Sequence, residues 1–287
     1  MKIKDILAKG HPILSFEVFP PKTNEGFESV RTATAAIAEL KPPFMSVTCG
    51  AGGTTGGFTA RVAADIQKTS GVPTVAHLTC VGTSKAGIHA ALAELKELGI
   101  ENIFALRGDL PEGATPDSFD FHHAAELVRE IRAYGDFSIG CAAYPEGHPE
   151  SPSQREDIRF LAEKVEAGCD FMTTQMFFDN NVLYNFLYKV REAGIRIPVI
   201  AGIMPVTNAA QITRICKLSG TKLPPRFARI VDRYGDDPAA MKQAGIAYAT
   251  EQIVDLFANG VPAVHVYSMN KPDVAAAIKA NISEIIK

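Results

Sequence analysis

The stretch REAGIRIPVIAGI, residues 191–203, contains the unit that decides the fold. A helical pattern stops at Gly194, a residue that adopts the left-handed conformation of a helix end without steric cost, and an apolar, β-branched run follows. The same transition from helix through glycine to strand recurs at Gly99, Gly168 and Gly260. Repetition of this unit is typical of alternating strands and helices around a parallel sheet.

Eight short apolar runs predict the strands of this sheet, at 13–19, 44–48, 73–79, 102–107, 137–144, 170–175, 197–203 and 261–267. The segments between them carry apolar residues at three- and four-residue spacing, and no Ser/Pro-rich linker divides the chain. Eight strands are the number that closes a (β/α)8 TIM barrel, so we predict one such domain over 1–287, with an N-terminal helix. The interval 204–260 has room for two helices and a connection, which predicts a helical insertion before the last strand. An open doubly wound sheet is the structural alternative.

Composition narrows the class of protein. The chain has 287 residues, 46% of them hydrophobic and 21% charged, and contains no apolar run long enough to span a bilayer. Its net charge of -3, without a basic block, argues against nucleic acid or a membrane surface as the partner and favours small molecules. The first residues do not resemble a secretory signal, so we expect a cytoplasmic protein. We also expect a homo-oligomer, because this is the common state of soluble enzymes. Five scattered cysteines and unpaired histidines predict neither a disulfide framework nor a metal site.

Polar residues cluster where the predicted strands end. In a (β/α)8 barrel the carboxyl ends of different strands supply the catalytic side chains, because they meet at one mouth. Seven of the eight runs end in such residues, namely Glu17, Thr48, His77, Arg107 with Asp109, Tyr144, Gln175, and Tyr267 with Ser268 and Asn270. A single polar residue at a strand end is explained as well by a structural role, with its hydrogen bonds satisfied, as by a functional one. The recurrence of such residues in seven strands predicts an active site.

The run CGAGGTTGG, residues 49–57, follows the second strand. It has Thr55 where a Rossmann fingerprint needs glycine and is followed by Phe58 where a Walker loop needs lysine, so it fits neither phosphate motif. Its glycines permit close approach of the backbone to a flat or anionic ligand. A merely flexible loop explains the run equally well.

Eight motifs, in order along the chain, carry a resemblance to a known family: SFEVFPPKT, SVTCGAGG, AHLTC, ALRGDLP, AAYPEGHPES, TTQMFFD, AGIMPVTN and VHVYSMNK. Together they resemble the methylenetetrahydrofolate reductase family over essentially the whole chain. The resemblance implies a (β/α)8 barrel with noncovalent FAD that reduces 5,10-methylenetetrahydrofolate to 5-methyltetrahydrofolate in one-carbon and methionine metabolism. It further implies NADH or NADPH as the usual electron donor and no eukaryote-like regulatory domain after the last strand.

The resemblance also implies roles for individual residues. Glu17 corresponds to the general acid, Asp109 to the acid that contacts both pterin and flavin, and Gln175 to a residue that touches substrate and nicotinamide in turn. Gln211 falls in a helix on the substrate side, and Lys271 falls near the folate glutamate. The positions that line the FAD in the family are Thr48, Cys49, Ala51, His77, Arg107, Gly108, Asp109, His123, Ala124, Tyr144, His148, Asp157 and Lys164. The family often has tyrosine at the position of Cys49 and arginine at that of Lys271, and lysine keeps the charge without the bidentate fork.

The chemistry of this reaction agrees with a buried acid at Glu17. Opening the imidazolidine ring leaves an iminium at N5, and the departing N10 amine needs a proton. Glu17 is flanked by Phe16, Val18 and Phe19, an apolar setting that is expected to raise a carboxyl pKa toward working pH. An anionic Asp109 is expected to hold the pterin and stabilise the cationic iminium.

Two other functions are compatible with the same barrel. A cofactor-free lyase or pterin transferase would use the polar mouth without a flavin. A flavin-bearing subunit that takes electrons from a donor protein would keep the flavin but not react directly with nicotinamides.

Overall fold

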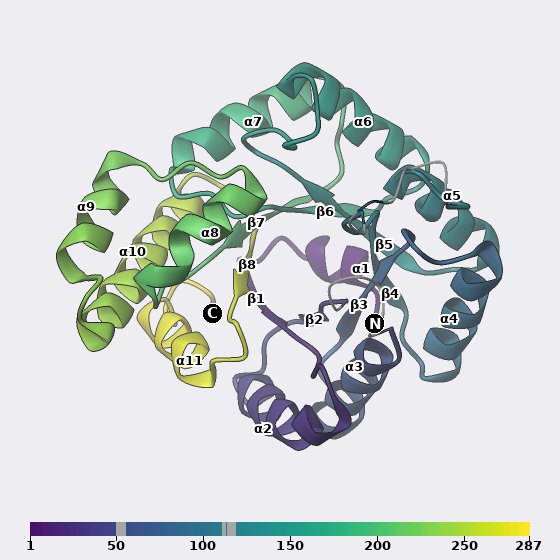
Figure 1. The fold of residues 1–287 in the computed structure, drawn as a ribbon, viewed down its shortest axis with the longest axis horizontal. Helices are drawn as coiled ribbons and strands as arrows, with labels where there is room; N and C mark the ends of the chain where they lie inside the picture. Colours follow the sequence, from purple (N-terminus) through teal and green to yellow (C-terminus); the bar gives the residue numbers. More distant parts are fainter. Residues whose placement is uncertain (50–55, 111–112, 114–118) are drawn as a thin grey trace.

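The protein folds into a closed barrel of eight parallel strands that follow one another in sequence order, which confirms the predicted fold class. The computed structural model describes residues 1–49, 56–110, 113 and 119–287. Figure 1 looks along the barrel, with the strands in the centre and the helices in a surrounding ring. The strands are β1 (Ile13–Val18), β2 (Met45–Val47), β3 (Thr74–Thr79), β4 (Asn102–Leu106), β5 (Ser138–Ala143), β6 (Phe171–Thr174), β7 (Val199–Ile203) and β8 (Ala263–Tyr267).

The helices that follow the strands form the outer layer. They are α2 (Phe27–Ala38, preceded by the 3-10 turn η1, Asn24–Gly26), α3 (Gly56–Ser70), α4 (Lys85–Glu97), α5 (Ala124–Tyr134), α6 (Gln154–Glu166), α7 (Asn180–Glu192), α8 (Ala209–Ser219), α9 (Pro225–Tyr234), α10 (Pro238–Ala258) and α11 (Pro272–Asn281). Among the helices of the described part, none combines the length and apolarity needed to cross a bilayer.

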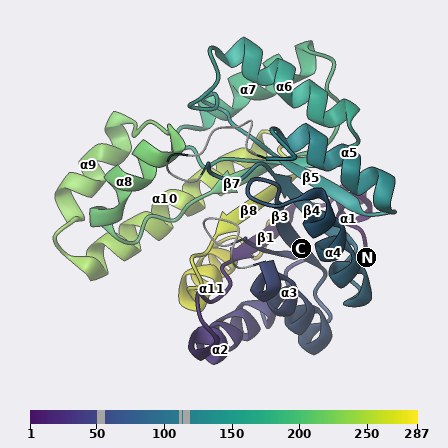
Figure 2. The same ribbon diagram turned by 45° about the vertical axis from the view of Figure 1, so that its right-hand side comes forward.

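The predicted insertion before the last strand contains one helix more than expected. Residues 204–260 form α8, α9 and α10, because Pro225 begins a helix at α9 where the sequence suggested a connection. Asp237 separates α9 from α10 by accepting hydrogen bonds from the backbone N–H groups of Ala239 and Ala240. Figure 2 shows α8 and α9 projecting beyond the ring of helices.

The predicted helix stops are confirmed by the backbone. Gly99, Gly168, Gly194 and Gly260 have φ angles of 72°, 121°, 83° and 78°, in the region that residues with a side chain rarely adopt. Each glycine therefore turns the chain from a helix back toward the next strand.

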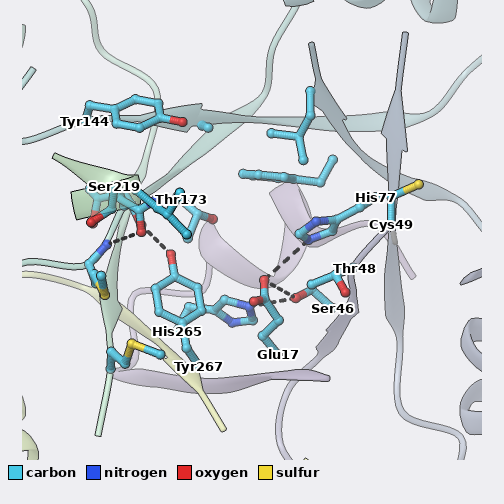
Figure 3. A pocket seen from close by; sticks show the side chains of 18 of the residues that line it. Glu17, Ser46, Thr48, Cys49, His77, Tyr144, Thr173, Ser219, His265 and Tyr267 are labelled. Carbon is cyan, nitrogen blue, oxygen red and sulfur yellow. Dashed lines mark hydrogen bonds and ion pairs between the residues drawn. The ribbon is translucent and has the colours of Figure 1, made fainter. Parts of the chain in front are cut away.

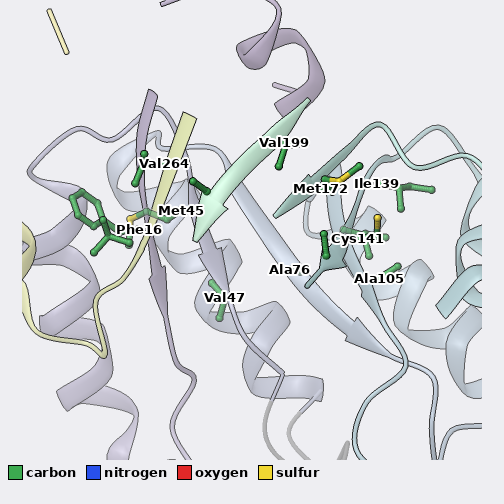
Figure 4. Packing of buried hydrophobic residues seen from close by; sticks show 14 of the residues in the cluster. Phe16, Met45, Val47, Ala76, Ala105, Ile139, Cys141, Met172, Val199 and Val264 are labelled. Atoms are coloured by element: carbon green, nitrogen blue, oxygen red, sulfur yellow. The ribbon is translucent and has the colours of Figure 1, made fainter. Parts of the chain in front are cut away.

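Alternation along the strands separates two hydrophobic layers. Phe16 and Val47 belong to the large cluster between strands and helices, part of which is drawn in Figure 4. Inside the barrel a smaller cluster includes Phe104 and Phe171. The N-terminal helix α1 (Ile3–Leu7), as predicted, is present, and its buried apolar side chains join this inner cluster. Its first N–H, at Ile3, donates to Oδ1 of Asn102 at 2.8 Å, so α1 is fastened to the amino-terminal end of β4.

Gly140 in β5 leaves the space that the inner aromatic rings occupy. A Cβ at this position would lie 2.5 Å from ring carbons of Phe171 and 2.7 Å from the ring of Phe104. We therefore expect Gly140→Ala to lower the free energy of unfolding by roughly 1–3 kcal/mol, measured by urea denaturation. Gly57→Ala is the matched control, because a Cβ there has no described atom within 4 Å, and its effect should stay within about 1 kcal/mol. Equal unfolding midpoints for the two variants would contradict this account of the barrel interior.

Candidate active site

The carboxyl ends of the strands enclose a cavity of about 610 Å³. This volume lies within the range of about 300–1,000 Å³ that is usual for small-molecule sites. Seven strands contribute lining side chains: Glu17, Ser46, Val75, His77, Phe104, Leu106, Ala142, Phe171, Thr173, Thr174, His265 and Tyr267. Met204 follows β7, and α8 adds Ile215, Leu218 and Ser219, so the inserted helix forms part of the wall.

Glu17 lies near the end of β1, with 9% of its surface exposed. Its Oε2 atom is 3.5 Å from Oγ of Ser46 and 3.6 Å from Nε2 of His77 (Figure 3). Burial raises the pKa of Glu17 to about 8, against the lowering effect of the Ser46 hydroxyl. Burial also lowers the pKa of His77 to about 3, so at neutral pH the contact between His77 and Glu17 is not an ion pair. In the described part of the chain, Glu17 has no lysine within salt-bridge distance, unlike a structural ion pair.

The apolar setting of Glu17 has a different origin from the one the sequence suggested. Phe16 and Val18 point to the helix side of the strand, because side chains alternate between the two faces. Of the three predicted neighbours, Phe19 lines the cavity. Phe44, which directly precedes β2, and Phe104 of β4 line it with Glu17.

Two tyrosines keep their protons in this site. Burial raises the pKa of Tyr144 to about 12, with Asp109 as the next cause, and burial also raises the pKa of Tyr267. The Tyr267 hydroxyl donates to the carbonyl of Thr174 at 2.5 Å. Gly202 permits this contact, since a Cβ there would lie 2.3 Å from the Tyr267 hydroxyl oxygen.

The loops after β4 and β5 are joined by an ion pair at the cavity wall. Arg107 donates from Nη1 and Nη2 to the two carboxylate oxygens of Glu150, at 2.6 and 2.7 Å. The hydrogen bonds to Glu150 are the main cause that raises the pKa of Arg107. In the same loop the rings of Tyr144 and His148 meet edge to face with centroids 4.6 Å apart. This wall is therefore ordered by polar and aromatic contacts between two loops.

Many of the predicted site residues meet in this one cavity. The residues that line it are Glu17, Thr48, Cys49, His77, Arg107, Asp109, Tyr144, His148 and Gln175. Gly108 lies between two of them with a φ angle of 89°. A Cβ at Gly108 would lie 3.2 Å from Cβ of Thr79, so glycine allows both the turn and the close packing. Ala51, together with residues 50–55 of the glycine run, lies outside the described residues.

Four predicted flavin-lining residues lie on the neighbouring helices and not on the cavity wall. His123 precedes the first turn of α5, which begins at Ala124, and the His123 ring stacks on Phe160 of α6 with centroids 6.5 Å apart. Asp157 accepts a hydrogen bond from the Ser151 hydroxyl at 3.2 Å.

Lys164, the fourth of them, donates to the carbonyl of Ala142 at 2.6 Å. Gln211 and Lys271, predicted to contact substrate, also lie outside the lining. Gln211 is exposed on α8. Lys271 precedes α11 and donates to Oγ1 of Thr207 at 2.6 Å.

Several lining residues were missed in the sequence. Ser46 and His265 both line the cavity. Ser46 lies two positions before the strand-end residue Thr48 in the sequence, and His265 lies two positions before Tyr267. A period of two along a strand was therefore a usable signal, because it places these residues one layer deeper on the same face. The α8 wall residues had no comparable signal, since their position depends on how the insertion folds back.

The cavity has the properties that a planar cofactor requires. Thr48 Oγ1 is buried at its wall and is one of two buried side-chain polar atoms without a hydrogen-bond partner among the described residues. A buried hydroxyl in this state is costly unless a ligand completes its bonding. Aromatic walls, two protonated phenols and an arginine surround the same space. The residues present therefore fit a ring system with hydrogen-bonding edges and an anionic tail.

Comparison with known proteins gives a consistent result over the chain. The sequence profile of the family described as "Methylenetetrahydrofolate reductase" matches residues 2–283. The "5,10-methylenetetrahydrofolate reductase" of Pectobacterium carotovorum subsp. carotovorum is 34% identical over 271 residues, which cover 94% of this chain and 90% of that protein. The "Methylenetetrahydrofolate reductase (NADH) 1" of Arabidopsis thaliana is 35% identical over 300 residues, covering 99% of this chain and 50% of the relative.

A solved structure shares the fold at low sequence identity. It is an uncharacterized protein from Clostridium thermocellum that binds two copies of 5-methyl-5,6,7,8-tetrahydrofolic acid, with a TM-score of 0.66, 13% identity and 99% of both chains covered. The chain spans about half the length of the plant relative and most of the length of the bacterial one. With the profile match over nearly its full length, the chain belongs to the methylenetetrahydrofolate reductase family.

Proposed function

We propose that this protein is a flavin-dependent reductase that converts 5,10-methylenetetrahydrofolate to 5-methyltetrahydrofolate, as part of cytoplasmic one-carbon and methionine metabolism. The observation that carries the proposal is a carboxylic acid, Glu17, that faces the cavity with a pKa raised to about 8 by burial. Such an acid is protonated at neutral pH and can therefore give a proton to a leaving group. Membership of the family supplies the substrate class.

Glu17 is proposed to protonate N10 of the folate. As the bond between N10 and the methylene carbon breaks, the electron pair of this bond stays on N10 and takes the Glu17 proton, and the methylene carbon becomes part of an iminium with N5. Aromatic side chains on the cavity wall, such as Phe104 and Phe171, limit the access of water to this cation. Asp109, which lines the same cavity, is proposed to hold the pterin and to stabilise the positive charge.

FAD is the proposed cofactor, and when bound it supplies the hydride that turns the iminium carbon into a methyl group. Thr48, Cys49 and His77 line the cavity on the β2 and β3 side, where they would contact the ring system. Arg107 and the α5–α6 group of His123, Ala124, Asp157 and Lys164 are proposed to hold the remainder of the cofactor. Tyr144 and His148 line the same cavity with their rings in edge-to-face contact.

Gln175 and Lys271 are proposed to bind substrate, together with Gln211 on α8. NADH and NADPH are the candidate donors, and the Arabidopsis relative carries NADH in its name. A homo-oligomer without nucleic-acid or membrane partners is part of the same proposal. A donor protein in place of a nicotinamide, or a reaction without flavin, is an alternative that the following measurements separate.

Glu17→Gln should separate the two halves of the reaction. The amide keeps the shape of the side chain but transfers no proton at neutral pH. Flavin reduction by NADH or NADPH, followed anaerobically by stopped-flow absorbance, should stay within a few-fold of the wild type. Reoxidation by methylenetetrahydrofolate should fall by about 10²- to 10⁴-fold, the usual contribution of a positioned general acid.

The parent protein provides the controls for this experiment. It should be yellow and release FAD on denaturation, whereas FMN or colourless protein after reconstitution contradicts the cofactor assignment. Flavin that is reduced by neither nicotinamide points to a donor protein. A Glu17→Gln variant that is reoxidised at the parent rate removes Glu17 from the role of acid.

The raised pKa of Glu17 also predicts how stability depends on pH. The folded protein binds the Glu17 proton up to about pH 8, whereas the unfolded chain releases it near the ordinary value of 4.5. Stability from this group is therefore complete below 4.5 and is lost as pH rises through 8. Urea unfolding should be measured between pH 5 and 9. The free energy of unfolding of Glu17→Gln should rise relative to that of the wild type up to about pH 8, and the difference should stay constant above this pH. A constant difference across this range would mean that Glu17 has an ordinary pKa.

Lys271 is proposed to bind a folate carboxylate. Its hydrogen bond to Thr207 leaves the ammonium without a carboxylate partner within 4.0 Å among the described residues. Lys271→Ala should raise the KM for the folate by the equivalent of about 1–3 kcal/mol and leave flavin reduction unchanged. Lys271→Arg is the matched control and should keep the folate KM close to the parent value. An unchanged KM in the alanine variant would remove Lys271 from the folate site.

A further inference from the structure

Glu17 ends a line of four side chains from β1, β2 and β8 in the barrel interior, of which Figure 3 labels Glu17, Ser46 and His265. The Oγ atom of Ser15 lies 2.7 Å from Nδ1 of His265, and Nε2 of His265 lies 2.7 Å from Oγ of Ser46. Ser46 Oγ in turn lies 3.5 Å from Oε2 of Glu17. The proposed reaction gives no role to Ser15, Ser46 or His265, although all three are buried.

The far end of this line favours one direction for its hydrogen bonds. Ser15 Oγ is 3.2 Å from the carbonyl oxygen of Val264, which can only accept. If Ser15 gives its one hydrogen to Val264, it accepts the hydrogen bond from Nδ1 of His265, and both contacts are used; if Ser15 donates to Nδ1, the contact with Val264 is left without a hydrogen. Burial lowers the pKa of His265 to about 3, which keeps the ring neutral, so a proton on Nδ1 leaves Nε2 as an acceptor.

The near end of the line agrees with this direction. Ser46 Oγ lies 2.7 Å from Nε2 of His265 but 3.5 Å from Oε2 of Glu17. A hydroxyl that donates to a carboxylate normally lies at about 2.5–2.7 Å from it, so the longer distance does not fit such a bond. In this direction Ser46 donates its hydrogen to His265 and presents a lone pair to Glu17, whereas a hydrogen donated to Glu17 would lower the pKa of Glu17.

We infer that His265 is a positioning residue for the proposed acid: held by Ser15 as the Nδ1–H tautomer, it takes the hydrogen of Ser46, so that Ser46 favours the protonated form of Glu17. The inference rests on the proposed function, because it matters only where Glu17 gives up a proton. The line ends at a backbone carbonyl and so cannot bring a new proton from solvent. The ring itself is fixed by stacking on Phe44, with centroids 5.7 Å apart.

Other groups around Glu17 do not supply the same control. Among the described residues, the titratable groups that face Glu17 are His77 from β3 and His265 and Tyr267 from β8. Burial lowers the pKa of both histidines and raises that of Tyr267, so all three are neutral at pH 7. The charge state of Glu17 is thus governed by burial and by which way the Ser46 hydrogen points.

The first test reads the tautomer directly in the holoprotein. Long-range proton–nitrogen NMR correlation of protein labelled with nitrogen-15 histidine distinguishes a protonated Nδ1 from a protonated Nε2, and the signal missing in His265→Gln assigns the residue. We expect a neutral ring with the proton on Nδ1 between pH 5 and 9. A proton on Nε2, or a doubly protonated ring, overturns the inference. This outcome does not depend on whether the protein reduces methylenetetrahydrofolate.

The second test changes the pKa of Glu17 by substituting Ser15, which is linked to Glu17 only through His265 and Ser46. Ser15→Ala removes the acceptor of the Nδ1 proton, which should move to Nε2, because a buried N–H without a partner is costlier than an unpaired lone pair. Ser46 then receives that hydrogen bond and can donate its own hydrogen to Glu17. The carbonyl band of protonated Glu17, assigned by infrared difference against Glu17→Gln, should titrate about 1 to 2 pH units lower than in the parent.

Two variants control this measurement. Ser15→Thr keeps the hydroxyl and should keep the parent titration. Ser138→Ala removes another fully buried strand serine, which accepts the N–H of Lys4 at 3.3 Å on the opposite side of the barrel floor, and should leave Glu17 unmoved. A purely structural role for Ser15 predicts lost stability without a shift. No shift in Ser15→Ala, an upward shift, or an equal shift in Ser138→Ala therefore overturns the inference.

Discussion

The pairing of β1 with β8 is the constraint on which the rest of the structure depends. It closes the barrel by joining segments that are about 250 residues apart, and its register places Ser15 beside His265 and Glu17 beside Tyr267. Because side chains alternate along each strand, the same register sends Phe16 and Val266 to the helix side. A slip by one residue would exchange the two sets and bury the wrong face. Closure thus determines both the hydrophobic layers and the composition of the cavity.

The mouth of this barrel shifts the pKa values of its buried polar groups away from those that they have in water. Glu17, His77 and His265 are each kept in the neutral state by burial, which shifts carboxyl and imidazole pKa values in opposite directions. Neutral groups can be packed together at 3.5 Å and 3.6 Å without the repulsion or desolvation cost of ions. The part of the site around Glu17 is therefore a group of neutral hydrogen-bonding side chains, whereas the charged pair of Arg107 and Glu150 lies on the loop wall.

Much of the fold could be predicted because its signals are local. Glycines with positive φ mark the helix ends, and apolar runs mark the strands. Strand boundaries were less accurate where a proline precedes the strand. The runs beginning at 197 and 261 form β7 from Val199 and β8 from Ala263, directly after Pro198 and Pro262, residues that have no N–H to donate to the ladder.

The site was predictable to the extent that it follows strand ends. Glu17, His77 and Tyr144 were identified in this way, and they do meet in one cavity. Which residues would lie beneath them was not predictable, because His265 reaches Ser46 only through closure of the barrel. The third helix of the insertion was missed for another reason. A proline pair reads as a break in the chain, but Pro225 starts a helix in the structure.

The inserted helices have a hydrophobic cluster of their own. Phe227, Met241 and Tyr248 pack with residues of the loop after β6, and this cluster shares no member with the two barrel clusters. Leu218 of α8 nevertheless faces the cavity while 72% of its surface is exposed. A substitution of Leu218 therefore leaves the packing of the two barrel clusters intact, because it belongs to neither of them. In evolutionary terms, the exposed end of α8 can vary in sequence independently of the barrel core.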